Sequence, residues 1–139
     1  MNLLLDTHAW LWFALGDASR ISPHAREEIE SASREGRLAV SVISVWEIAM
    51  LEAKGRIALG IPCEKWVESA LSLPGLRLID LDPGIAVASS RLPGEIHVDP
   101  ADRILAATAR SKNAVLATAD LRLIEYGKSG YVRVLDLRV

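Results

Sequence analysis

The chain has 139 residues, with 16 Lys and Arg against 18 Asp and Glu, and its mean hydropathy is +0.22. This apolar excess excludes a disordered chain, suits one domain over residues 1–139, and favours a buried protein interface. The single cysteine, Cys63, excludes an internal disulfide framework, and Asp6 interrupts the first apolar run, so we expect a cytoplasmic protein without a signal peptide or membrane span.

Strands and helices are predicted to alternate along the first half of the chain. The expected elements are a strand at Leu3–Leu5, a helix around His8–Leu15, a helix from Pro23 to about Arg34, a strand at Leu38–Val42 and a helix at Ser44–Lys54. Ser22 before a proline is typical of a helix N-cap, and Gly36 and Gly55 are typical of helix ends.

The same alternation continues in the second half. The expected elements are a helix at Cys63–Ser72, a strand at Leu76–Ile79, a short helix at Gly84–Ser90, a helix from Pro100 to about Arg110, and strands at Ala114–Ala117 and Val132–Leu135. This order predicts an α/β domain with a mostly parallel sheet, in which ligands collect at the carboxyl ends of the strands.

Four acidic residues lie beside apolar segments, where a charge is costly unless something compensates it. Asp6 and Asp120 each come just after an expected strand. Glu47 is the only charge between Val42 and Leu51, and Asp102 lies near the start of a helix. We expect one edge of the sheet to hold all four side chains.

Such a cluster calls for a cation. Two carboxylates about 5 Å apart repel by roughly 3 kcal/mol at an effective dielectric of about 20. Mg²⁺ or Mn²⁺ is the natural compensation, because hard cations prefer carboxylate oxygens. A bound metal ion activates water and offsets the charge that develops on a phosphodiester, so the pattern points to metal-assisted phosphodiester hydrolysis.

The four acids can be given roles in that chemistry. Asp6 and Asp102 are the best direct metal ligands, and Asp120 completes the metal site directly or through water. Glu47 either ligates a second ion or orients the attacking water. All four are therefore candidate catalytic and metal-binding residues.

Polar neighbours of the acids have candidate roles as well. Thr7 and Thr118 are positioned to hydrogen-bond to the carboxylates or to substrate. Arg103 either meets a phosphate or pairs with an acid. Asp99, as an N-cap ahead of Pro100, has a sufficient structural role, and we favour that role over metal ligation.

Each acid taken alone also has a structural alternative. Asp6 could be a turn residue, and Glu47 could point to solvent. Asp102 would be favoured by the helix dipole with or without a metal, and Asp120 could cap a short helix toward Glu125. The joint pattern favours the metal site.

Charge is distributed unevenly along the chain. Residues 1–99 carry 9 Lys and Arg and 14 Asp and Glu, a net charge of −5, whereas residues 100–139 carry 7 and 4, a net charge of +3. The second segment could form a basic surface that follows a phosphate backbone, or it could be ordinary surface charge.

The histidines and tryptophans receive structural interpretations. The histidines are scattered and lack a metal-ligand spacing, so we interpret them as structural or surface residues: His8, His24 and His97. The tryptophans are interpreted as core or interface residues rather than as stacking platforms for bases: Trp10, Trp12, Trp46 and Trp66.

Four segments in order resemble the PIN-domain nucleases and, within them, the VapC-type toxins of toxin–antitoxin pairs. The matching segments are LLLDTHAWLWF at 3–13, SVISVWEIAML at 41–51, HVDPADRILAATA at 97–109 and LATADLRL at 116–123. The family's four acids map onto Asp6, Glu47, Asp102 and Asp120.

The resemblance implies a single PIN-like domain over residues 1–139, built as a three-layer α/β/α sandwich. It also implies Mg²⁺- or Mn²⁺-dependent cleavage of RNA, inhibition by a cognate antitoxin protein, and a homodimer. A catalytically silent PIN-like RNA-binding module is the alternative. A phosphatase of the haloacid dehalogenase type is disfavoured, because the second acid that it needs two residues after Asp6 is replaced by His8.

Overall fold

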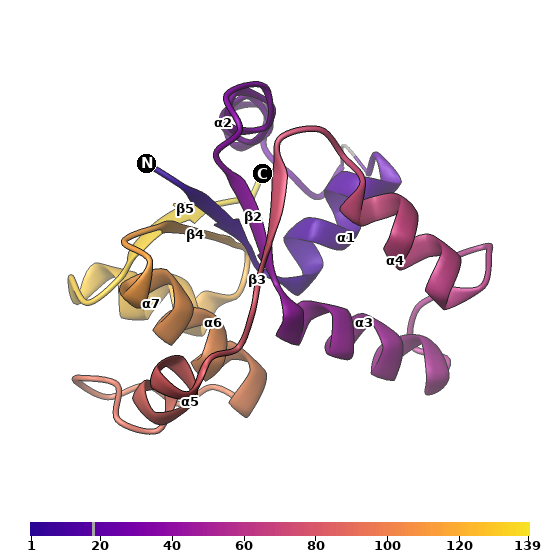
Figure 1. Cartoon of the computed structure of the whole chain (residues 1–139). Helices are drawn as coiled ribbons and strands as arrows, with labels where there is room; N and C mark the ends of the chain where they lie inside the picture. The colour runs from indigo at the N-terminus through magenta and orange to yellow at the C-terminus, as the bar shows by residue number, and fades with distance from the viewer. Residues whose placement is uncertain (18) are drawn as a thin grey trace.

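A five-stranded parallel sheet lies between two layers of helices in the computed structural model, which describes residues 1–17 and 19–139 (Figure 1). The elements are β1 (Leu3–Leu5), α1 (Thr7–Leu15), α2 (Pro23–Arg34), β2 (Leu38–Ser41), α3 (Val42–Ala53), α4 (Cys63–Leu71), β3 (Leu76–Ile79), α5 (Pro83–Ser89), α6 (Pro100–Ser111), β4 (Val115–Thr118), α7 (Leu121–Lys128) and β5 (Arg133–Asp136). The strand order is β3-β2-β1-β4-β5, and every neighbouring pair is parallel. The expected three-layer α/β/α sandwich is confirmed.

The central strand β1 is apolar throughout because both of its faces are covered. Successive side chains of a strand point to opposite faces, so its three leucines divide between two cores. Leu3 and Leu5 pack in a core with Trp10, to which α1 to α4 contribute. Leu4 packs with Leu105 in a second core, to which α5 to α7 contribute. Figure 1 shows the helices of these cores on opposite sides of the sheet.

The helix starts predicted from serine or aspartate before proline are confirmed. The Ser22 hydroxyl accepts a hydrogen bond from the Ala25 N–H at 3.1 Å and caps α2. The Asp99 carboxylate accepts one from the Asp102 N–H at 2.9 Å and caps α6. These bonds satisfy backbone donors that a helix start leaves without intrahelical partners.

The junction of β2 and α3 differs from the prediction. The strand was expected to run to Val42 and the helix to begin at Ser44, but the strand ends at Ser41 and Val42 begins the helix. The Ser41 hydroxyl accepts a hydrogen bond from the Ile43 N–H at 3.1 Å. The hydrophobic residues continue from the strand into the helix, so the hydrophobic pattern does not mark this boundary.

Other boundaries move by one residue, in α1, α4, α5, α6, β4, β5 and at the end of α3. Helix α7 was expected only as the short helix that Asp120 could cap. Asp120 does cap it, so this structural alternative is confirmed. Within residues 1–17 and 19–139, no helix has the length and apolar character needed to cross a membrane.

At Gly75, just before β3, the backbone lies very close to the backbone of helix α2. Its φ is +83°, and a β-carbon placed there would lie 1.8 Å from the Ser33 carbonyl oxygen. The Ser33 hydroxyl also donates to the Pro74 carbonyl at 2.9 Å, which holds the two segments together. A side chain at position 75 would therefore push β3 away from α2.

We expect Gly75→Ala to lower the free energy of unfolding by about 2 kcal/mol or more, because it adds a backbone clash to the strain of a positive φ. Gly36→Ala is the matched control, since Gly36 has a φ of +70° with nothing near its β-carbon position. That control should lose only about 1 kcal/mol. Urea denaturation of both variants measures the difference, and equal losses would contradict the expectation.

Candidate active site

An acidic cleft of about 380 Å³ opens at the carboxyl ends of β1 and β4. Its lining residues come from both sides of the sheet: Asp6, Thr7, His8, Trp12, Arg20, Glu47, Asp99, Asp102, Ala119 and Asp120. The structure thus brings all four acids singled out in the sequence into one cleft, as expected from a parallel sheet. Asp99 joins them while also capping α6.

Asp6 lies at the floor of this cleft, where β1 passes into α1. Its side chain is 5% exposed and caps α1 by accepting a hydrogen bond from the Ala9 N–H at 2.8 Å. The other carboxylate oxygen accepts a hydrogen bond from the Thr118 hydroxyl. Burial raises the pKa of Asp6 to about 6, although the bonds from Thr118 and Ala9 act in the opposite direction.

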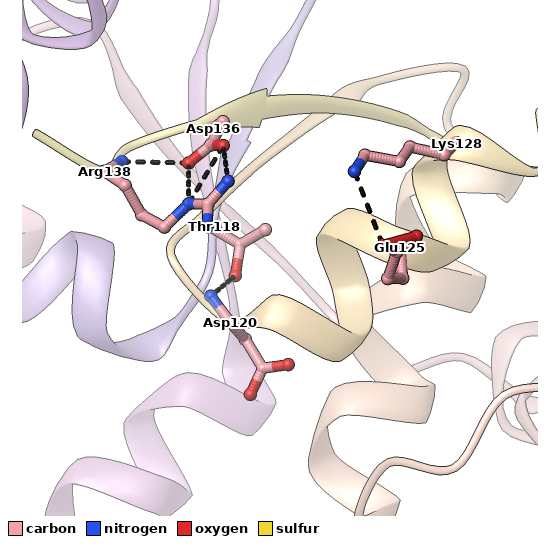
Figure 2. Close-up of polar contacts among 6 residues, drawn as sticks. All are labelled: Thr118, Asp120, Glu125, Lys128, Asp136 and Arg138. Carbon is pink, nitrogen blue, oxygen red and sulfur yellow. Dashed lines mark hydrogen bonds and ion pairs between the residues drawn. The ribbon is translucent and has the colours of Figure 1, made fainter.

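Thr118 links Asp6 to Asp120. It ends β4, and its hydroxyl oxygen accepts a hydrogen bond from the Asp120 N–H at 3.0 Å (Figure 2). The Asp120 carboxylate caps α7 by accepting from two backbone N–H groups, at 2.9 and 3.2 Å. Figure 2 shows this carboxylate pointing away from the exposed Asp136–Arg138 ion pair on the neighbouring strand.

Glu47 reaches the cleft from α3, which packs against both α1 and α6. Its carboxylate accepts a hydrogen bond from the Thr7 hydroxyl, which is also hydrogen-bonded to the buried Ser44 hydroxyl at 2.9 Å. Burial raises the pKa of Glu47, the Thr7 hydrogen bond lowers it, and the charge of Asp99 raises it. Of the two threonines predicted to contact carboxylates, Thr7 therefore holds Glu47 and Thr118 holds Asp6.

Asp102 experiences the strongest repulsion in the cleft. The pKa of Asp102 is raised to about 8. Burial is the largest cause, and the negative charges of the neighbouring acids add to it, in the order Asp99, Asp120, Asp6 and Glu47. In the described part of the chain no hydrogen bond reaches its carboxylate. Without a cation this side chain is therefore largely protonated at neutral pH.

Arg103 does not pair with an acid in the described part of the chain. Its guanidinium donates to the Ser89 carbonyl at 2.8 Å and to the Ile96 carbonyl at 3.2 Å. These bonds tie α6 to the end of α5 and to the segment that follows it. Arg103 is also not among the residues that line the acidic cleft.

The sequence analysis missed three residues that line the acidic cleft, His8, Trp12 and Arg20. His8 and Trp12 are four residues apart on α1, with ring centroids 5.7 Å apart. That spacing places two side chains on one helix face, next to the cap residue Asp6, and it is the signal that could have found them. Nothing in the sequence marks Arg20.

The other tryptophans divide between interior and surface. Trp10 and Trp66 are core residues, as expected, with ring centroids 5.2 Å apart. Trp46 is 56% exposed on α3, so it is not part of the core. Its predicted role at an interface stays a prediction.

Among residues 1–17 and 19–139, the acids of the cleft have no cationic partner at salt-bridge distance. The ion pairs found there involve other carboxylates, those of Asp17, Glu35, Glu125 and Asp136. In the same residues no three His, Cys, Asp or Glu side chains already converge as the ligands of one metal ion would.

Comparison with known proteins places this arrangement in a family. The family model described as PIN domain matches residues 3–129. A Mycobacterium tuberculosis protein named Ribonuclease VapC22 is 36% identical over 122 residues, which cover 88% of this chain and 89% of that protein.

Solved structures agree at the level of the fold. The chain is similar to one in VapBC2 from Rickettsia felis bound to a promoter DNA fragment, with a TM-score of 0.72, 17% identity and 99% of both chains covered. It is also similar to one in DNA-bound VapBC from Salmonella typhimurium, with a TM-score of 0.68, 21% identity and 98% of both chains covered. Taken together, the acidic cleft, the sheet that forms it and these matches show that the chain belongs to the PIN domain family, in its VapC branch.

Proposed function

We propose that this chain is an endoribonuclease that hydrolyses RNA phosphodiester bonds with Mg²⁺ or Mn²⁺ and acts as the toxin of a toxin–antitoxin pair. The observation that carries the proposal is the gathering of Asp6, Glu47, Asp102 and Asp120 in one cleft of a PIN fold. The relationship to a protein named as a ribonuclease supports the reaction. Structures titled as VapBC complexes and as a toxin–antitoxin complex support the biological role.

The chemistry of the cleft fits a divalent cation. All the acidic donors are hard carboxylate oxygens, the type that Mg²⁺ and Mn²⁺ prefer. Burial, and after it the negative charges of the neighbouring acids, raise the pKa of Asp102, and a bound cation would oppose both effects. Asp6, Asp102 and Asp120 would hold the ion, with Glu47 beside them. A bound ion supplies activation of water and neutralisation of charge on the phosphate.

The protein's own groups supply orientation and proton transfer. Thr118 fixes one Asp6 oxygen, and the Ala9 N–H fixes the other, so this carboxylate has a defined direction. Thr7 fixes Glu47 in the same way. Because burial raises the pKa of Glu47, its carboxylate is a stronger base than an exposed one and is suited to take a proton from the attacking water.

The proposed antitoxin is a small protein that inserts a segment near the acidic cleft. A basic side chain from that segment would pair with the carboxylates and compete with the metal ion, because both compensate the same negative charge. The RNA substrate and the antitoxin would therefore bind at the same acidic cleft. The exposed apolar side chains Trp46 and Val87 are available for partner contacts, including those of a homodimer.

We expect the purified wild-type chain to cleave RNA from a total pool with Mg²⁺ or Mn²⁺ but not with EDTA. Asp6→Asn should lower the cleavage rate by about 100-fold or more, because it removes the charge of a proposed metal ligand. Asp80→Asn is the matched control. Asp80 also directly follows a strand, β3, but it is exposed and does not line the acidic cleft.

Gel analysis of the RNA products distinguishes the outcomes. Discrete products that need metal, persist in Asp80→Asn and disappear in Asp6→Asn support the ribonuclease. A folded wild-type protein, free of antitoxin, that leaves every tested RNA intact while binding it without metal would favour the catalytically silent RNA-binding module instead.

The stability of the metal-free protein should fall as pH rises from about 4 to about 8. The folded pKa values of Asp6 and Asp102, about 6 and about 8, exceed the unfolded value of 3.8, so the folded state binds more protons across this window. Raising the pH removes that contribution, which for the buried Asp6 is roughly 3 kcal/mol. Urea denaturation in EDTA at pH 5 and pH 8 measures the part of this loss that falls between those two values, about 1.4 kcal/mol for Asp6.

Two comparisons test the cause of this loss. Asp102→Asn should be more stable than wild type at pH 8 and lose less between the two pH values, since it cannot ionise. Mn²⁺ should stabilise the wild type at pH 8 and the variant much less. A metal-free wild type that gains stability toward pH 8 would contradict the sign of these pKa shifts.

The chain should form a stable complex with the product of its neighbouring reading frame. That complex should lack RNA cleavage, and its stability should fall when a basic residue of the partner's inserted segment is changed to Ala. Size-exclusion chromatography of the co-expressed pair, followed by the cleavage assay, measures both. Full cleavage activity in the intact complex would argue against inhibition at the acidic cleft.

A further inference from the structure

The acidic cleft creates a problem for the function proposed above. A cleft floor made of carboxylates repels the phosphates of an RNA strand, and this repulsion acts on every phosphate that approaches the floor. A bound metal ion offsets it only locally. Some cationic group of the protein must therefore hold the strand close to the floor.

The basic residues of the segment 100–139 are mostly engaged elsewhere. Arg103 and Arg110 donate to backbone carbonyls, and Arg133 donates to the Asn113 side chain. Lys128 and Arg138 form ion pairs with acids of their own segment. None of these five side chains lines the acidic cleft as the structure describes it.

Arg20 is the one Lys or Arg among the described residues that line the cleft. Its guanidinium carbon lies 5.5 Å from the centre of the Trp12 ring, which gives a cation–π contact. Its Nε lies 3.7 Å from an Asp17 carboxylate oxygen. Trp12 in turn lies against His8, so the three side chains form one edge of the cleft.

These contacts orient Arg20 without neutralising it permanently. Its side chain is 60% exposed, and an exposed ion pair at this distance contributes little to stability. A phosphate can therefore replace Asp17 as the partner. The Trp12 ring restricts the guanidinium while leaving its planar fork of N–H donors free, and that fork matches two phosphate oxygens.

We propose that Arg20 binds a backbone phosphate of the RNA next to the scissile one, and that Trp12 positions it. The inference rests on the proposed ribonuclease function, because it assigns a substrate contact to the same cleft. It explains how an acidic cleft on a protein with a net charge of −2 holds a polyanion. The contact acts on substrate binding, since it lies on the rim and not among the acids of the floor.

Arg20→Gln should weaken binding of a short fluorescein-labelled single-stranded RNA by about tenfold, measured by fluorescence anisotropy in EDTA, where no cleavage occurs. The dependence of log K on log salt concentration should become shallower by about 0.7, the value for one lost phosphate contact on a single strand. Arg20→Lys keeps the charge and should recover part of the affinity. In the cleavage assay with Mn²⁺, KM should rise while kcat changes little.

Arg34→Gln is the matched control, because Arg34 is exposed at the end of α2 and does not line the cleft. Equal salt dependence and equal KM for Arg20→Gln and wild type, with both cleaving RNA, would overturn the role of Arg20 and leave the ribonuclease standing. A loss that Arg34→Gln reproduces would overturn it too. A wild type that cleaves no RNA with either metal would overturn the proposed function and this inference together.

Discussion

Repulsion among carboxylates at the carboxyl ends of β1 and β4 is the constraint on which the rest of the structure depends. The fold reduces it in part. Asp6, Asp99 and Asp120 cap the helices α1, α6 and α7, so three acids sit at the positive ends of helix dipoles. Burial first, and then the negative charges of Asp99, Asp120, Asp6 and Glu47, still raise the pKa of Asp102 to about 8. A divalent cation is suited to offset the remainder.

The topology of the sheet decides which acids meet. β1 lies at the centre with β4 as its neighbour, although the two strands are more than 100 residues apart in the chain. Thr118 then connects them by donating to Asp6 and accepting from the Asp120 N–H. On the other side, Thr7 connects α1 with α3 through Glu47. Two threonines thus set the direction of two carboxylates, one between neighbouring strands and one between two helices on the same side of the sheet.

The floor and the rim of the cleft have opposite charge and different tasks. The floor concentrates negative charge, which favours a cation and disfavours RNA. The rim carries Arg20 against Trp12, which favours a phosphate. For the ribonuclease that we propose, this separation would allow a chain with a slightly negative overall charge to bind RNA, because a strand near a cation responds to the local field more than to the net charge.

The sequence by itself determined the type and order of most elements and the identity of the four acids. Local signals were sufficient for these features. Ser22 and Asp99, each before a proline, indicate the start of a helix. An acid next to a buried apolar segment is energetically costly wherever that segment packs. The sequence did not indicate where the strand ends and the helix begins at Val42, because apolar residues continue from one element into the other. The roles of Arg103 and Arg20 were decided only by the tertiary structure, because they depend on carbonyls and rings brought close by packing. A basic side chain has the same appearance in a sequence whether it holds the fold or faces a ligand, and only its long-range neighbours distinguish the two.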